Sequence, residues 1–331
     1  MRPSTIITAV AAALLASQAA GQDAEGPLTV YAPDYFASEW GPGPAIKAAF
    51  EQSCGCEIEW VTGDVLPRLR LEGARTRADV VIGLASDEQE AARATGLFAP
   101  HGVDASGLTM PVAWSDDTFL PFNWSHVAFV YDSTRVAEPP ESFRDLVENH
   151  SDLRIAIQDP RTSVSGLALA LWIHAVWGEE AEAAWRALAP RVAAVTRGWS
   201  ESYGLFTEGE VDMVLSYATS PAYHIIAEGD ETKRAAIFSE GHYLTVETAG
   251  LVADTDQPEL ARTFMDFVLD PAFQRTIPEG NWSMPARLDP ADLPEGFGTL
   301  PMPEASILYP PAEAEALRAP AVAAFERGLG G

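Results

Sequence analysis

Short runs of apolar residues alternate along this chain with longer segments in which apolar residues recur every three or four positions. The short runs predict buried strands at residues 28–31, 58–61, 78–83, 127–131, 155–157, 213–215 and 246–252. The longer segments predict helices, chiefly at residues 66–72, 86–95, 167–176, 179–188 and 258–269. This alternation of strands and helices predicts an α/β fold whose mainly parallel sheets are covered by helices.

Two segments interrupt the alternation and divide it into two series. Residues 114–124 mix aromatic and polar side chains, and residues 223–245 separate the strand at 213–215 from the next one. The chain has 331 residues, which exceeds the size of one ordinary core. We therefore predict two α/β lobes with a ligand in the cleft between them.

The lobe boundaries follow from where the chain crosses between the two series. We assign residues 27–124 and 238–331 to the first lobe and residues 125–237 to the second. The crossings near Asn123 and Thr245 are predicted to act as hinges that let the lobes close on a ligand.

The segment beyond Pro285 is rich in proline and alanine. Apolar periodicity predicts a last helix at about residues 312–327. Pro320 lies inside it, lacks a backbone N–H and clashes with the preceding turn. We therefore expect this helix to be kinked or split.

Residues 198–223 carry the strongest local indication of a binding site. Ser200 is a candidate N-cap with Trp199 just before it, and a buried strand follows at residues 213–215. The strand leads into a loop of small and hydroxyl-bearing residues, and open α/β sheets bind ligands at such strand ends. Core packing explains either tyrosine taken alone, but the group favours a ligand; its members are Trp199, Tyr217, Thr219, Ser220 and Tyr223.

The charge of the chain narrows the class of partner. Lysine and arginine number 21 against 48 aspartates and glutamates, which gives a formal net charge of −27. We expect no nucleic-acid partner, because a phosphate backbone requires a basic surface. An acidic surface suits a cationic small molecule, and it equally suits adaptation to salt.

The N-terminus has the composition of a secretory signal peptide, predicted at residues 1–22. Arg2 supplies a positive charge, residues 6–15 are apolar but too short to span a bilayer, and small residues follow. We expect export to the periplasm as a soluble protein. The two cysteines, Cys54 and Cys56, would close a very small loop, so a disulfide and two free thiols are equally open.

The sequence offers no constellation typical of an enzyme or a metal centre. Six histidines are scattered along the chain, and neither HExxH nor GxSxG occurs. We therefore predict a binding protein that is not an enzyme and that has no cofactor, metal site or catalytic residue.

Several sequence blocks occur together in an order that resembles one family, the periplasmic thiamine-binding proteins of bacterial ABC transporters. The resemblance covers residues 28 to about 297. Its most specific motifs are GWSESYGLF and LSYATSPAYHI, which distinguish this family from its ferric-iron and polyamine relatives. The blocks are WGPGP at 40–44, RLRLEG at 68–73, ADVVIGL at 78–84, TGLF at 95–98, QDPRTS at 158–163, GWSESYGLF at 198–206, LSYATSPAYHI at 215–225, FSEGHYL at 238–244 and GNW at 280–282.

The resemblance implies a two-lobed type-2 periplasmic binding fold that captures thiamine and its mono- and diphosphate. It also implies delivery to an inner-membrane ABC permease, and we expect a monomer. The positions that match family ligand contacts are Ser163, Val164, Trp199, Tyr217, Ala218, Thr219, Ser220, Tyr223 and Trp282. One departure is Pro33, which stands where the family commonly has a tyrosine, and Tyr35 is a candidate replacement.

The chemistry of thiamine agrees with these residue types. Its thiazolium ring is a permanent cation, and an aromatic face attracts a cation by about 0.5–2 kcal/mol. Ser163 precedes an apolar helix, and free N–H groups at helix N-termini bind anions such as phosphate. Asp34 is either an acceptor for the aminopyrimidine or a turn-forming residue. The alternative function is binding of ferric iron or another small cation such as a polyamine, because Tyr217 and Tyr223 resemble part of an iron site.

Overall fold

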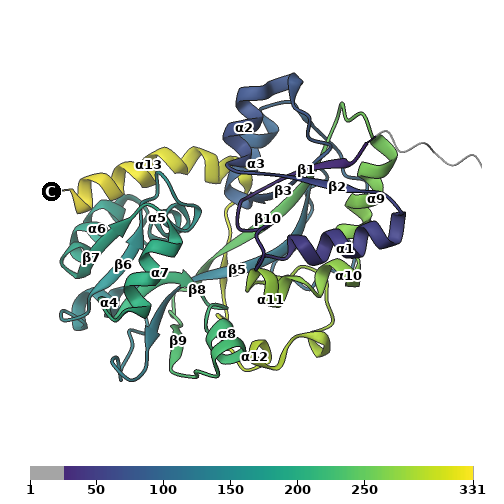
Figure 1. Cartoon of the computed structure of the whole chain (residues 1–331). Helices are drawn as coiled ribbons and strands as arrows, with labels where there is room; N and C mark the ends of the chain where they lie inside the picture. The colour runs from purple at the N-terminus through teal and green to yellow at the C-terminus, as the bar shows by residue number, and fades with distance from the viewer. Residues whose placement is uncertain (1–25, 331) are drawn as a thin grey trace, which may run out of the picture.

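The computed structural model describes residues 26–330 and shows two lobes joined by long strands (Figure 1). The predicted signal peptide at residues 1–22 lies outside the described residues. Within the described range, no helix is both long and apolar enough to cross a membrane. One continuous path of strands runs through both lobes. Its order is β2 (Ile58–Thr62), β1 (Leu28–Ala32), β3 (Val80–Ala85), β10 (His242–Val252), β5 (Phe119–Asp132), β8 (Met213–Tyr217), β6 (Ile155–Gln158) and β7 (Val192–Thr196).

The first lobe contains the parallel strands β1, β2 and β3, with helices on both faces. The pairs β1–β2 and β1–β3 are parallel, whereas β10 pairs with β3 in the antiparallel sense. The core of the lobe includes Phe36, Phe50 and Phe264. Its elements are β1 (Leu28–Ala32), α1 (Gly43–Cys54), β2 (Ile58–Thr62), α2 (Val65–Glu72), η1 (Gly73–Arg75), β3 (Val80–Ala85), η2 (Ser86–Glu88), α3 (Gln89–Arg93), β4 (Phe98–Ala99), α9 (Pro258–Val268), α10 (Pro271–Gln274), α11 (Ile277–Asn281), β11 (Met284–Pro285), η6 (Pro290–Asp292) and α12 (Glu295–Gly298).

The second lobe repeats the design with β8, β6 and β7. These strands are parallel to one another, and β8 and β9 each pair with β5 in the antiparallel sense. The core is centred on α5, whose residues 165–173 are all buried. Its elements are α4 (Phe143–Asn149), β6 (Ile155–Gln158), α5 (Val164–Trp177), η3 (Gly178–Glu180), α6 (Ala181–Leu188), η4 (Ala189–Arg191), β7 (Val192–Thr196), α7 (Trp199–Thr207), β8 (Met213–Tyr217), α8 (Pro221–Tyr223), η5 (His224–Glu228) and β9 (Lys233–Ala236).

Two long strands, β5 (Phe119–Asp132) and β10 (His242–Val252), pass between the lobes (Figure 1). Every residue of β5 is buried, because protein covers both of its faces along its whole length. The predicted interruption at residues 114–124 is therefore wrong from Phe119 onward. A third connection returns the chain to the second lobe through β12 (Ser306–Ile307), which pairs with the start of β10.

The last helix, α13 (Pro311–Leu329), packs on α5 and α6 of the second lobe (Figure 1). Its residues Ala321, Ala324 and Phe325 belong to the core of that lobe. The assignment of residues 238–331 to the first lobe is therefore wrong for α13. Pro320 lies inside one continuous helix, so the predicted splitting of this helix is also wrong.

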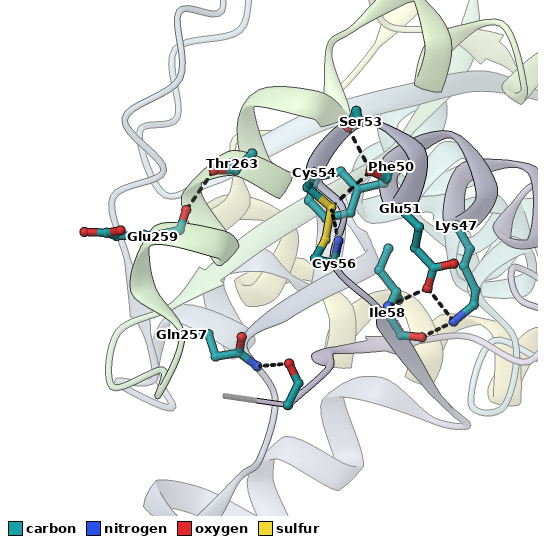
Figure 2. Close-up of a disulfide and its surroundings, with 11 residues drawn as sticks. Lys47, Phe50, Glu51, Ser53, Cys54, Cys56, Ile58, Gln257, Glu259 and Thr263 are labelled. Carbon is teal, nitrogen blue, oxygen red and sulfur yellow. Dashed lines mark hydrogen bonds and ion pairs between the residues drawn. A yellow bond between two sulfur atoms is a disulfide. The ribbon is translucent and has the colours of Figure 1, made fainter. Parts of the chain in front are cut away.

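Cys54 and Cys56 form a disulfide at the end of α1, which settles the question left open by the sequence (Figure 2). The helix ends at Gly55, whose φ of 67° is left-handed and suits glycine. Two polar side chains fasten the following turn to β2. Glu51 accepts from the backbone N–H of Ile58 at 2.8 Å and pairs with Lys47 Nζ at 2.9 Å.

Candidate functional site

The register of the two crossing strands places five polar side chains on one face of the sheet at the lobe junction. Asn123 and Ser125 of β5 lie directly opposite Glu247 and Thr245 of β10, and Tyr217 of β8 lies opposite Val127. Residues paired in this way project to the same side of a sheet. We call this set the crossover face; it consists of Asn123, Ser125, Tyr217, Thr245 and Glu247.

The loop after β8 is fastened to this face by hydroxyl groups. Ser220 Oγ lies 2.7 Å from Ser216 Oγ and accepts from the backbone N–H of Tyr217 at 3.2 Å. Thr219 is fully buried, and its Oγ1 lies 3.4 Å from Ser125 Oγ. Ala218 is also fully buried. The loop that the sequence predicted as a ligand contact therefore has a fixed backbone next to β5.

Trp199 is the first residue of α7, with Gly198 as its N-cap, so the prediction that Ser200 caps this helix is wrong. The indole N–H donates to Ser216 Oγ at 2.8 Å, which joins Trp199 to the β8 loop. Its ring stacks on Tyr203 with the centroids 4.5 Å apart, yet 38% of the residue is exposed. One ring face is thus supported by the protein.

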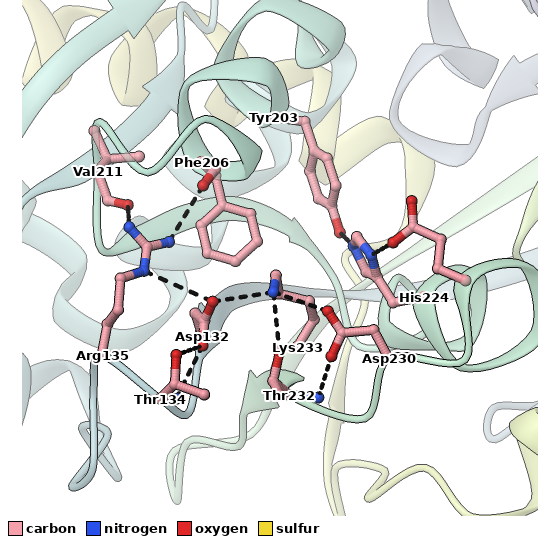
Figure 3. A network of polar contacts seen from close by, with 11 residues as sticks. Asp132, Thr134, Arg135, Tyr203, Phe206, Val211, His224, Asp230, Thr232 and Lys233 are labelled. Atoms are coloured by element: carbon pink, nitrogen blue, oxygen red, sulfur yellow. Dashed lines mark hydrogen bonds and ion pairs between the residues drawn. The ribbon is translucent and has the colours of Figure 1, made fainter.

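A hydrogen-bond chain that runs from buried Tyr203 and His224 to the surface holds the Tyr203 ring in place (Figure 3). The Tyr203 hydroxyl lies 2.9 Å from His224 Nε2, and His224 Nδ1 lies 2.7 Å from a Glu228 carboxylate oxygen. Burial raises the pKa of Tyr203 above its ordinary value. The hydroxyl therefore stays protonated, and the chain fixes the ring on which Trp199 rests.

Tyr223 of α8 and Trp282 at the end of α11 meet edge to face, with ring centroids 5.2 Å apart. Trp282 adopts φ 50°, and no other non-glycine residue of the described chain has a positive φ. Its ring also lies parallel to that of Phe297, with centroids 6.5 Å apart. Left-handed backbone in a bulky residue is costly, so surrounding contacts must hold this conformation.

The N-terminus of α5 carries Ser163 as its N-cap. Ser163 Oγ accepts weakly from the backbone N–H of Gly166 at 3.5 Å and lies 3.0 Å from Ser165 Oγ. Val164 is exposed. Burial raises the pKa of Tyr217 to about 12, with a smaller opposing effect from its hydrogen bond with Ser165. Ser165 thus links this helix end to Tyr217.

Asp34, which the sequence leaves open as a turn residue or an acceptor for the aminopyrimidine, lies in the loop after β1. Asp34 is exposed and makes no hydrogen bond or ion pair within residues 26–330. Tyr35 points its hydroxyl at the Glu247 carboxylate. Pro33 packs against Gly83, where an added Cβ would lie 2.5 Å from the proline ring and φ is already +84°.

Glu247 is the residue of this region that the sequence analysis missed. One carboxylate oxygen accepts from Tyr35, and the other accepts from Asn123 Nδ2 at 2.5 Å and from Asn281 Nδ2 at 2.7 Å. Burial raises the pKa of Glu247 to about 7. Because its partners are distant in sequence, only the neighbouring apolar run was visible locally, and that run predicted a strand.

Small hydroxyls join the two halves of the site. Ser125 Oγ donates to Ser283 Oγ at 3.1 Å, and Ser125 also contacts Thr219. Ser283 follows Trp282 in the chain, so a bridge runs from the β8 loop to the Trp282 loop. The predicted residues Trp199 and Ser220 meet through Ser216, whereas Asp34 meets none of the others.

Three residues of the described chain could together approach a metal ion: His224, Glu228 and Asp230, whose ligand atoms lie within 4.8 Å of one another. In the structure, however, these groups have other partners. Asp230 pairs with Lys233 Nζ at 3.0 Å, as Figure 3 shows, and His224 is held between Tyr203 and Glu228. Tyr223, one of the two tyrosines of the iron alternative, packs its ring on Trp282 and His224.

Comparison with known proteins places this geometry in a family. The profile of the bacterial extracellular solute-binding proteins matches residues 37–275. The thiamine-binding periplasmic protein of Escherichia coli is 48% identical over 306 residues, which is 91% of this chain and 93% of that protein.

Solved structures agree with the sequence comparison. A periplasmic thiamin binding protein superposes with a TM-score of 0.87 and 47% identity, covering 93% of this chain and 98% of the other. Iron-bound HitA from Pseudomonas aeruginosa superposes with a TM-score of 0.74 but only 22% identity, over 92% and 99% of the two chains, and shares the fold alone. The two-lobed type-2 periplasmic binding fold is thereby confirmed. The chain belongs to the bacterial extracellular solute-binding proteins and, within them, to the family of the thiamine-binding periplasmic proteins.

Proposed function

We propose that this protein is a periplasmic solute-binding protein that captures thiamine and delivers it to an ABC permease of the inner membrane. Its 48% identity to a thiamine-binding periplasmic protein over nearly the whole chain carries this proposal. The residues that match ligand contacts of the family are Ser163, Val164, Trp199, Tyr217, Ala218, Thr219, Ser220, Tyr223 and Trp282, and we propose them as the site.

The contacts at the lobe junction support this assignment. Trp199, Tyr223 and Trp282 offer aromatic rings for a flat cationic ligand. Ser163, at the N-terminus of the 14-residue helix α5, lies where free backbone N–H groups suit the phosphate of a thiamine ester. Thiamine monophosphate and diphosphate are therefore proposed as further ligands. We propose no catalytic step, no cofactor and a monomeric state.

Isothermal titration of the purified protein tests the proposal. We expect thiamine to bind at one site per chain and to be recovered unchanged after incubation. Absence of both heat and a thermal shift at millimolar thiamine would exclude the function. A coloured complex with ferric iron, caused by tyrosinate-to-iron charge transfer, would instead support the iron alternative.

A further inference from the structure

Glu247 is a carboxylate held among neutral groups. Its three hydrogen-bond donors are Tyr35, Asn123 and Asn281, and it takes part in no ion pair within residues 26–330. Two other partly buried carboxylates of the chain, by contrast, have cationic partners. Asp132 pairs with Lys233 Nζ at 3.0 Å, and Asp159 pairs with Arg161 Nη2 at 2.5 Å.

The negative charge of Glu247 lacks a cationic partner in this arrangement. Removing a carboxylate from water without a cationic partner disfavours its charged form, and this burial raises the pKa of Glu247 to about 7. Burial raises the pKa of Asp87 in the same way, but the Arg318 guanidinium already lies near that carboxyl and opposes the effect. Glu247 is thus a carboxylate held by neutral polar groups, and a cation arriving from outside would balance its charge.

The neighbours of Glu247 indicate the kind of cation that it would bind. Its carboxylate belongs to the crossover face, and its partner Asn281 immediately precedes Trp282, whose ring meets Tyr223. One step along the chain therefore separates a donor to this carboxylate from the aromatic pair on which a flat cation could rest. Asp34, for which the sequence leaves a turn-forming role and an acceptor role equally open, is exposed and has no hydrogen-bond or ion-pair partner within residues 26–330.

We propose that Glu247 is the counter-charge that selects a cationic aromatic ligand, and that it contacts the thiazolium ring of thiamine. This inference rests on the proposed function. In this proposal the Glu247 carboxylate favours a cationic ligand over a neutral one, whereas the aromatic rings contribute shape complementarity and apolar contact.

The surroundings of Glu247 allow a dependence on pH to be assigned to it. The loop after β1 presents Tyr35, whereas β5 and α11 present only the amides Asn123 and Asn281. From η2, next to β10, Asp87 and Glu88 interact with each other and with Arg318. Because a bound cation favours the ionised carboxylate, thiamine should release a proton on binding, and affinity should rise roughly tenfold from pH 6 to pH 8.

The test compares thiamine with a neutral isostere in which thiophene replaces thiazolium. We expect Glu247→Gln to weaken thiamine roughly tenfold or more, because an attraction between opposite charges is lost. The affinity of Glu247→Gln for the isostere should be less than threefold below that of the wild type. The variant should also lose the pH dependence of thiamine binding and the release of a proton on binding. Glu88→Gln, the same chemical change at another carboxyl of the first lobe, should leave thiamine affinity close to wild type.

Three outcomes would overturn the inference. Equal losses for thiamine and the isostere would mean that Glu247 only positions Tyr35 and Asn281. Wild-type affinity in Glu247→Gln would place the cation elsewhere, and an equal loss in Glu88→Gln would indicate a general effect of charge. Failure of the wild-type protein to bind thiamine is a separate result, which would remove the proposed function itself.

Discussion

Trp282 and Tyr223 stand edge to face with their ring centroids 5.2 Å apart, although they belong to different lobes. Trp282 follows α11 of the first lobe, and Tyr223 lies in α8 of the second. The pair therefore closes one side of the lobe junction. A ligand held there would contact both lobes at once, which is how binding energy can favour a closed arrangement.

Replacing Trp282 tests the aromatic part of the site. Trp282→Ala should weaken the binding free energy of thiamine by roughly 1–3 kcal/mol, because a cation–π contact and apolar burial are both lost. Trp282→Phe should lose less, since phenylalanine keeps a ring face. Titration calorimetry measures both, with circular dichroism to confirm folding. Wild-type affinity in both Trp282→Ala and Tyr223→Ala would place the site elsewhere.

His242 gives the fold a dependence on pH. Its ring contacts the carbonyl of Val127 through Nδ1 and accepts from the N–H of Phe238 through Nε2, both at 2.7 Å, which requires the neutral form. Burial lowers the pKa of His242 to about 4 and that of His126 to about 3. Each neutral ring stabilises the fold above the ordinary histidine pKa of about 6.5, and this contribution is lost as pH falls toward 4.

The measurement must compare variants, because Asp87 and Glu247 have raised pKa values and act in the opposite direction. We expect the free energy of unfolding of the wild type, relative to His242→Gln, to increase by up to about 1.4 kcal/mol per pH unit between pH 4.5 and 6. Urea denaturation at several pH values gives this difference. A constant difference across the range would show that His242 is not held neutral.

The sequence predicted those strands and helices that are determined by neighbouring residues, and it missed those that depend on pairing with distant segments. β1, β3 and α9 were predicted closely, because their burial follows from a short apolar run or a helical stripe. β9 was missed, since Lys233 and Arg234 begin it and it is a strand only because it pairs with β5. The full length of β5 was missed for a similar reason. Its polar residues are buried by contacts with both lobes.

The candidate site shows the same division. Tyr217, Thr219 and Ser220 lie within four consecutive positions, so their clustering is visible in the sequence. Glu247 is separated from Tyr35 by 212 positions and from Asn123 by 124, so nothing local connects them. A solitary glutamate beside an apolar run predicts only a strand. The hydrogen-bond partners of Glu247 became known only from the three-dimensional structure.

The disulfide should have a small and local effect. Cys54 and Cys56 are two positions apart, and the chain-entropy model gives about 1.5 kcal/mol for so short a loop. The double variant Cys54→Ser/Cys56→Ser should therefore lose about that much stability in urea denaturation. Its thiamine affinity should match wild type. A loss of affinity would mean that the turn between α1 and β2 reaches the site.

The contact of α13 with the second lobe should matter far more. Phe325 is 5% exposed and packs against Trp185, with ring centroids 5.1 Å apart. Phe325→Ala should lower the free energy of unfolding by about 3–5 kcal/mol. The neighbouring Glu326→Ala, which removes only an exposed pair with Arg161, should cost less than about 1 kcal/mol. Similar losses for the two variants would mean that the last helix is not part of the core.

The position of α13 also sets the order in which the molecule can be assembled during synthesis. The second lobe lacks three core side chains until residues 321–325 have been made. The first lobe similarly waits for Ala249 and Leu251 of β10 and for the residues of α9. The first lobe can complete its core only after Ala286 has been made, and the second only after Phe325. Folding of both lobes is therefore delayed until late in synthesis, which would suit a protein that is exported as an unfolded chain.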